Sequence, residues 1–132
     1  MNQRGRVTLA QFLAYRGGQP MAAWLLHRLT GIGIFLFVGM HVFAAFLLYG
    51  VTGGTANTVA NAVTDFYESR PVQIFVLFAV LYHAFNGLRI VILDMWPGLH
   101  RFHREAMWVQ WAIFLPVFLI PAFLIALGVK VG

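Results

Sequence analysis

Three long apolar segments constrain this sequence more than any other feature. They cover about residues 22–49, 71–95 and 106–129, and each is long enough to cross the hydrocarbon core of a bilayer as a helix. Backbone polar groups inside a bilayer must be hydrogen-bonded within the protein, and single segments achieve this as helices. We therefore predict an all-α integral membrane protein, a three-helix anchor forming one domain over residues 1–132.

The composition agrees with membrane spans rather than with a soluble core. Hydrophobic residues make up 61% of the chain and charged residues only 10%. There is no cysteine, which excludes disulfides, thiolate metal sites and iron–sulfur ligation by this chain. The net charge of +5 comes from eight arginines and one lysine, and no basic run is interleaved with aromatic residues, so we expect no nucleic-acid partner.

Shorter polar segments precede and separate the spans. Residues 1–20 are basic, with a short interfacial helix possible over residues 7–13 and a turn expected at residues 17–20. Residues 51–70 are expected to form a short surface helix or loop outside the hydrocarbon, and residues 99–105 form a basic second connection.

The basic residues predict the orientation in the membrane. Seven of the nine lie on the side of the N-terminus and the second connection, so we expect the N-terminus in the cytoplasm and the C-terminus outside. Polar positions inside two of the spans also favour a partner helical bundle, with membrane lipids around both. The seven are Arg4, Arg6, Arg16, Arg28, Arg89, Arg101 and Arg104.

His83 lies deep in the second span, where an ionisable side chain is costly and usually faces the protein interior. Gly87 and Asp94 follow it by four and eleven residues, close to whole helical turns, so the three share a stripe. A glycine one turn from a histidine leaves a gap beside a ligand nitrogen, in which a flat macrocycle could lie. The alternative is a histidine bonded to a carbonyl of a neighbouring helix, and this stretch alone does not choose between them.

The first span carries two further histidines. His41 is deep within it, whereas His27 is at the cytoplasmic boundary beside Arg28. His27, Gly31 and His41 share a helix face, from which Arg28 points away. Glycines such as Gly31 permit the close approach of another helix or of a ligand in a membrane.

Haem is the ligand that these histidines fit best. Two deep histidines without accompanying acidic residues are not typical of a proton relay, and no third deep ligand joins them to bind a metal ion. Haem needs only one or two imidazoles and an apolar sleeve. Boundary cations such as His27 and Arg28 would then pair with haem propionates or with a polar head group.

Two motifs resemble those of a known family. The sequence Leu-His-Arg-Leu-Thr-Gly at residues 26–31 resembles the H-R-[ILV]-[ST]-G element that opens the first span of the cytochrome b subunit, the membrane anchor, of the succinate dehydrogenase / fumarate reductase family. The sequence Tyr-His-Ala-Phe-Asn-Gly-Leu-Arg at residues 82–89, followed by Asp94, resembles the second-span haem element of the same family. The resemblance covers about residues 24–96. The third span matches the family only in being a membrane span.

This resemblance implies a membrane anchor of complex II. Such an anchor lies in the cell inner membrane, holds a flavoprotein subunit with its FAD and an iron–sulfur subunit with its clusters, and pairs with a second small membrane anchor subunit. Electrons pass from succinate to a quinone at the cytoplasmic end of the bundle. The chain would be a subunit of succinate dehydrogenase (quinone) that performs no succinate chemistry itself. Succinate oxidation and fumarate reduction both use such anchors.

The resemblance also implies a haem site. His83 is the expected axial ligand of haem b, with Gly31 and Gly87 beside the cofactor. His27 and Arg28 are expected near the haem propionates and the quinone pocket.

Two positions distinguish members of the family from one another. Trp24 stands where many members have a serine that lines the quinone site, so we expect Trp24 and Arg28 to border that site, with Trp24 as an aromatic wall. His41 stands late in the first span, where two-haem anchors carry a histidine, so we expect His41 to ligate a second haem nearer the outer face.

Two other functions remain open from the residues alone. A cytochrome b anchor of another respiratory oxidoreductase, such as a formate dehydrogenase or a hydrogenase, usually has more spans and more histidines. A haem-free membrane interaction protein would use its histidines only to connect helices.

Overall fold

The computed structural model describes residues 18–51, 53 and 58–129, and it is helical almost throughout this part of the chain. Three long helices, α2 (Gly18–Ala45), α4 (Arg70–Met95) and α5 (His103–Leu127), are accompanied by a short helix, α3 (Thr58–Tyr67). A π-helical turn, η1 (Phe46–Val51), extends α2, and a 3-10 segment, η2 (Pro97–Phe102), joins α4 to α5.

The prediction of three membrane-spanning helices is confirmed. Helical stretches over Pro20–Val51, Arg70–Met95 and Pro97–Leu127 are long and apolar enough to cross a bilayer. Pro71 lies in the first turn of α4, where its missing N–H is not needed for an intrahelical bond.

Two boundaries differ from the prediction. α2 already begins at Gly18, so the turn expected at residues 17–20 is wrong for its last three residues, and α5 begins at His103, inside the expected second connection.

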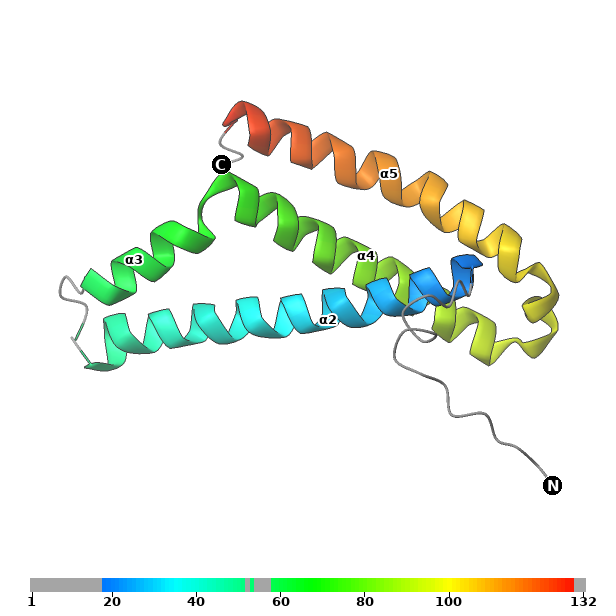
Figure 1. The fold of residues 1–132 in the computed structure, drawn as a ribbon, viewed down its shortest axis with the longest axis horizontal. Helices are drawn as coiled ribbons and strands as arrows, with labels where there is room; N and C mark the ends of the chain where they lie inside the picture. Colours follow the sequence, from blue (N-terminus) through cyan, green and yellow to red (C-terminus); the bar gives the residue numbers. More distant parts are fainter. Residues whose placement is uncertain (1–17, 52, 54–57, 130–132) are drawn as a thin grey trace, which may run out of the picture.

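The expected surface segment between the first two spans contains α3, whereas the interfacial helix considered for residues 7–13 lies outside the described residues. Figure 1 shows α3 running from the far end of α2 to the start of α4. Ala44 and Ala60 are buried, and small side chains of this kind allow neighbouring helices to approach closely.

The middle helix of the bundle is α4, which lies between α2 and α5 (Figure 1). An aromatic cluster joins α4 to α5: Phe114 is buried, and its ring packs edge to face against Phe78 and Tyr82 at centroid distances of 5.6 and 5.8 Å. Aromatic pairs in this geometry stabilise packing beyond the area they bury. α2 instead meets α4 through small and polar residues, and this contact contains two of the predicted histidines, His27 and His83.

Large apolar side chains cover the outside of the bundle. Phe35, Phe123 and Ile120 are each more than 60% exposed, an arrangement that suits lipid or a partner helix and would be unfavourable in water. The chain is thus a multi-pass membrane protein whose surface is built for an apolar environment.

Candidate functional site

The structure brings together His27 of α2 and His83 of α4. Their rings are stacked, with centroids 3.9 Å apart and planes inclined by 10°. The two helices run in opposite directions, so the start of α2 lies beside the second half of α4 (Figure 1). Sequence analysis selected both histidines but did not predict their contact.

A hydrogen bond orients His83. Its Nδ1 lies 3.0 Å from the backbone carbonyl oxygen of His27 and 3.4 Å from the hydroxyl oxygen of Thr30. Because a carbonyl oxygen can only accept, Nδ1 carries the ring proton and donates it. The bond at Nδ1 leaves Nε2 as the ring nitrogen that could bind a metal, which is how metal-ligating histidines are usually oriented.

Thr30 fixes this arrangement from within α2. Its side chain is buried, and its hydroxyl oxygen lies 2.8 Å from the carbonyl oxygen of Leu26 and 2.9 Å from that of His27. Sequence analysis assigned Thr30 no role, although it lies inside the first motif. The available signal was a threonine within an apolar helix, which can donate its hydroxyl to a carbonyl one turn earlier, here that of Leu26 or His27.

Each motif glycine faces the histidine of the other helix: Gly31 of α2 faces His83, and Gly87 of α4 faces His27. A Cβ atom added to Gly31 would lie 3.0 Å from Cε1 of His83, closer than side chains normally pack. A Cβ atom added to Gly87 would lie 3.6 Å from Cε1 of His27, an ordinary contact distance. Gly31 is therefore required for the present position of His83, whereas a small side chain at Gly87 would pack against His27 at an ordinary distance.

Several buried polar atoms around this contact lack hydrogen-bond partners among the described residues. They are Nδ1 of His27 and both side-chain polar atoms of Asn86; further along α4, toward α5, Nε and Nη1 of Arg89 are also unpaired. Asn86 is 0% exposed, and Tyr82, one turn earlier, donates its hydroxyl to the carbonyl oxygen of Ala23 at 3.4 Å. An unpaired buried polar atom costs about 1–3 kcal/mol, so such a cluster marks a place where a further group is accommodated.

Sequence analysis missed this polar side of α4. Tyr82, Asn86 and Arg89 are spaced by four and three residues, which places them on one helix face. Polar residues at that spacing within an apolar span were the available signal.

Trp24 and Arg28 meet on the surface of α2. The guanidinium carbon of Arg28 lies 4.1 Å from the centroid of the Trp24 ring. This is a cation–π contact between residues one helical turn apart. Both side chains are exposed. The predicted pair is thus together, but on a different side of α2 from the contact between the histidines.

His41 lies apart from the other histidines. It is fourteen residues beyond His27 on α2, about 21 Å along the helix axis. Its ring packs against the edge of Tyr67 from α3 at 5.2 Å and lies 6.4 Å from the ring of Phe37. A single haem held by both His41 and His83 is therefore incompatible with this arrangement. Asp94, expected on the same stripe as His83, is exposed near the end of α4.

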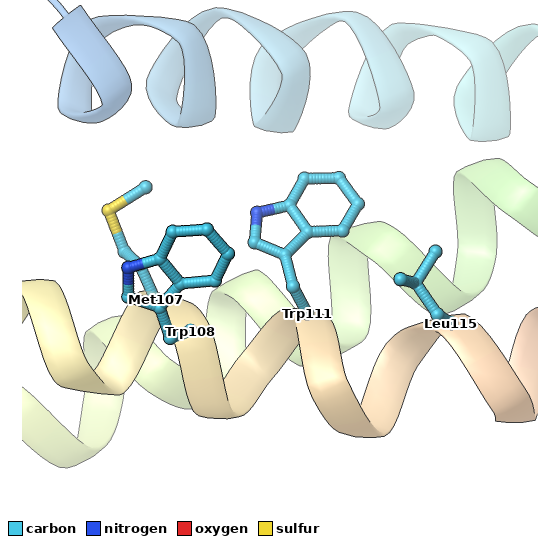
Figure 2. A pocket seen from close by; sticks show the side chains of 4 residues that line it. All are labelled: Met107, Trp108, Trp111 and Leu115. Carbon is cyan, nitrogen blue, oxygen red and sulfur yellow. The ribbon is translucent and has the colours of Figure 1, made fainter.

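A groove separates α2 from α5 beside Tyr82. Figure 2 shows four side chains of α5 pointing toward α2 and lining a cavity of about 300 Å³; they are Met107, Trp108, Trp111 and Leu115. A neighbouring cavity of about 180 Å³ shares Met107 and Trp111 and adds Ala22, Ala23, Leu26 and Tyr82. Neither of these two cavities includes Trp24 or Arg28.

Comparison with known proteins gives a consistent result. The sequence profile of the family described as succinate dehydrogenase/fumarate reductase transmembrane subunit matches residues 3–126. The chain is 34% identical to a succinate dehydrogenase 2 membrane subunit of Mycobacterium tuberculosis over 121 residues, which is 89% of this chain and 81% of that one.

Two more distant relatives are similar over a shorter stretch. A succinate dehydrogenase hydrophobic membrane anchor subunit of Archaeoglobus fulgidus is 30% identical over 63% of this chain and 68% of its own. The mitochondrial succinate dehydrogenase cytochrome b560 subunit of Sus scrofa is 31% identical over 64% of this chain and 50% of its own.

The close approach of His83 to Gly31 yields a test. Gly31→Ala should lower the stability of the purified protein by about 1–3 kcal/mol, because the added methyl group forces the ring or the helix to shift. Gly39→Ala is the matched control: nothing lies within 4 Å of its added Cβ atom, so it should leave the thermal transition unchanged or raise it slightly. Equal melting temperatures for the two variants would contradict the contact.

Proposed function

Because the chain belongs to the succinate dehydrogenase/fumarate reductase transmembrane subunit family, we propose that it binds haem b and anchors the catalytic subunits of a succinate:quinone oxidoreductase to the membrane. The flavoprotein subunit would carry FAD and the iron–sulfur subunit its clusters, so no succinate chemistry would take place on this chain. The observation that carries the haem proposal is the bond from Nδ1 of His83 to the His27 carbonyl, which leaves Nε2 available as a ligand.

The residues around His83 fit a haem. The same hydrogen bond would also serve a histidine that only connects helices, so the choice rests on its surroundings. Gly31 and Gly87 keep side chains away from both imidazoles, and His27 and Asn86 have unpaired buried polar atoms beside the contact. A purely structural site would have little reason to leave so many buried polar atoms unpaired. When bound, the haem supplies a one-electron redox centre held by His83, with His27 and Arg28 toward its propionates.

Trp24 and Arg28 are our candidates for the border of the quinone site. The ring of Trp24 holds the Arg28 guanidinium in place, and a fixed cation can donate hydrogen bonds to a quinone oxygen. Both side chains are exposed on this chain, so the remaining walls would come from the iron–sulfur subunit and the second small anchor subunit.

The partners and the orientation follow from the same proposal. We place the protein in the cell inner membrane with its N-terminus in the cytoplasm, because seven of its nine basic residues lie on that side. The second anchor subunit would cover part of the exposed apolar surface and complete the apolar surroundings of the haem. The end at which α2 begins would face the soluble subunits.

A second haem at His41 is the less supported part of the proposal. His41 is exposed on the described chain, at a depth clearly separate from His83, and aromatic rings of Phe37 and Tyr67 flank it. No glycine lies one turn away from it, in contrast to His83. Ligation of a second haem by His41 stays a prediction.

Replacing the proposed ligand tests the haem site. His83→Ala should remove the visible spectrum of six-coordinate haem b from the purified complex, while gel analysis still shows the flavoprotein and iron–sulfur subunits. His100→Ala, in the exposed η2 segment, should leave the spectrum unchanged. An unchanged spectrum for His83→Ala would reject His83 as the ligand.

Arg28 is tested by comparing two electron acceptors. Arg28→Leu should lower quinone reduction about tenfold or more, because a hydrogen bond from a charged group contributes about 1.5–3 kcal/mol. Reduction of a soluble dye by succinate should remain near the wild-type rate. Arg101→Leu removes a similar exposed arginine, stacked on Phe102 at 4.7 Å, and should affect neither activity. Equal loss of both activities in Arg28→Leu would indicate an assembly defect.

The number of haems tests His41. Extraction of haem and flavin from the purified complex should give two haems per FAD, and His41→Ala should reduce the ratio to one. A ratio near one in the wild-type complex would reject the second haem and leave His41 with a structural role.

A further inference from the structure

A third cavity lies between α4 and α5, near the η2 segment that joins them. Its volume is about 250 Å³, and its wall is mostly apolar. The wall includes Leu99 of η2, and Figure 1 shows that η2 joins α4 to α5 at one end of the bundle, so the cavity is close to one membrane surface. The residues on which the following argument depends are Leu88, Arg89, Ile92, Leu99, Gln110 and Ile113.

Two polar side chains in this apolar wall have unpaired atoms. Nε and Nη1 of Arg89 are buried and have no hydrogen-bond partner among the described residues. Gln110 is 6% exposed, and its Oε1 is likewise unpaired. The acidic residues nearest in sequence, Asp94 and Glu105, are exposed. A cation and an acceptor therefore line the cavity together without a counterpart from the described part of the chain, and a buried charge without an anion is costly.

The depth of this polar pair matches the head-group region of a bilayer. Trp108 is 59% exposed, and Trp96 is exposed just before η2; exposed tryptophans in membrane proteins concentrate at the interface. Gln110 is only two residues beyond Trp108, about 3 Å along α5. The apolar residue Ile113 continues the cavity one turn deeper into the span.

The cavity faces away from the proposed haem site. Ile92 is nine residues after His83, which places it on the opposite side of α4. This step rests on the proposed function, because it assumes that the second anchor subunit covers the side of His83. The side of Ile92 is then left to lipid.

We propose that this cavity binds an anionic phospholipid whose head group carries a hydroxyl. The phosphate would accept hydrogen bonds from Arg89, and the head-group hydroxyl would donate to Oε1 of Gln110, so that both unpaired groups are satisfied. An acyl chain lies along Leu88, Ile92 and Ile113. Arg101 in η2 and Arg104 in the first turn of α5 add positive charge at the same end of these two helices.

Lipid titration of the purified complex tests this site. After delipidation in detergent, native mass spectrometry compares the binding of phosphatidylglycerol with that of phosphatidylcholine carrying the same acyl chains. The wild-type complex should bind phosphatidylglycerol about tenfold more tightly, the difference expected for one charge-assisted hydrogen-bonded pair. Arg89→Leu should abolish this preference. Arg70→Leu removes the same charge at the opposite end of α4 and should retain the preference.

A steric variant separates lipid binding from folding defects. Ile113→Trp fills the cavity without changing its charge and should weaken binding of both lipids, whereas Leu119→Trp, at an exposed position of α5 outside the cavity wall, should not. The haem spectrum, recorded on the same samples, reports on the proposed function independently of lipid binding.

Two outcomes would overturn the proposal. One is an unchanged preference for phosphatidylglycerol in Arg89→Leu together with unchanged binding of both lipids in Ile113→Trp. The other is crosslinking of a photoreactive group at residue 113 to a partner subunit instead of to lipid, which would assign the cavity to a protein interface.

Discussion

The contact between α2 and α4 at His83 is the interaction on which the candidate site depends. The imidazole donates to the His27 carbonyl, packs against Gly31 and stacks on the His27 ring, so one side chain sets the rotation of two helices about their axes. In a bilayer, association of helices has little hydrophobic driving force, and close packing with interhelical hydrogen bonds determines the arrangement. The same bond that joins the helices also directs Nε2 away from the backbone.

The sides of the described helices differ in how many of their polar groups have hydrogen-bond partners. Around Phe78 and Tyr82, the face of α4 toward α5 is closed by an aromatic cluster centred on Phe114. Nearer η2, Asn86 and Arg89 of α4 have unpaired buried atoms, and the side of α2 with Trp24 and Arg28 is open. This is the pattern expected of one subunit of an assembly, because the missing hydrogen-bond partners and walls can come from cofactors, lipids and other chains.

Part of the candidate site was predictable from the sequence and part was not. His27, Gly31, His83 and Gly87 were recognisable because ionisable residues and glycines are conspicuous in apolar spans and occur at whole-turn spacing. Their reciprocal packing was not predictable, because it depends on how far one helix is shifted and rotated against the other. The roles of Thr30, Asn86 and Gln110 were missed for the same reason: a polar residue in a span can face lipid, a groove or a buried contact, and only the packing decides which.

By itself the sequence determined the helical class, the three spans and the identity of the chemically distinctive residues. These properties are local, since each span satisfies its own backbone hydrogen bonds and its length is matched to the bilayer. Only the tertiary structure decided that His83 meets His27 and not His41, that α4 is the middle helix, and that Arg89 and Gln110 share one cavity. Those outcomes depend on contacts between residues more than twenty positions apart, and no local periodicity encodes which faces of two helices will pack together.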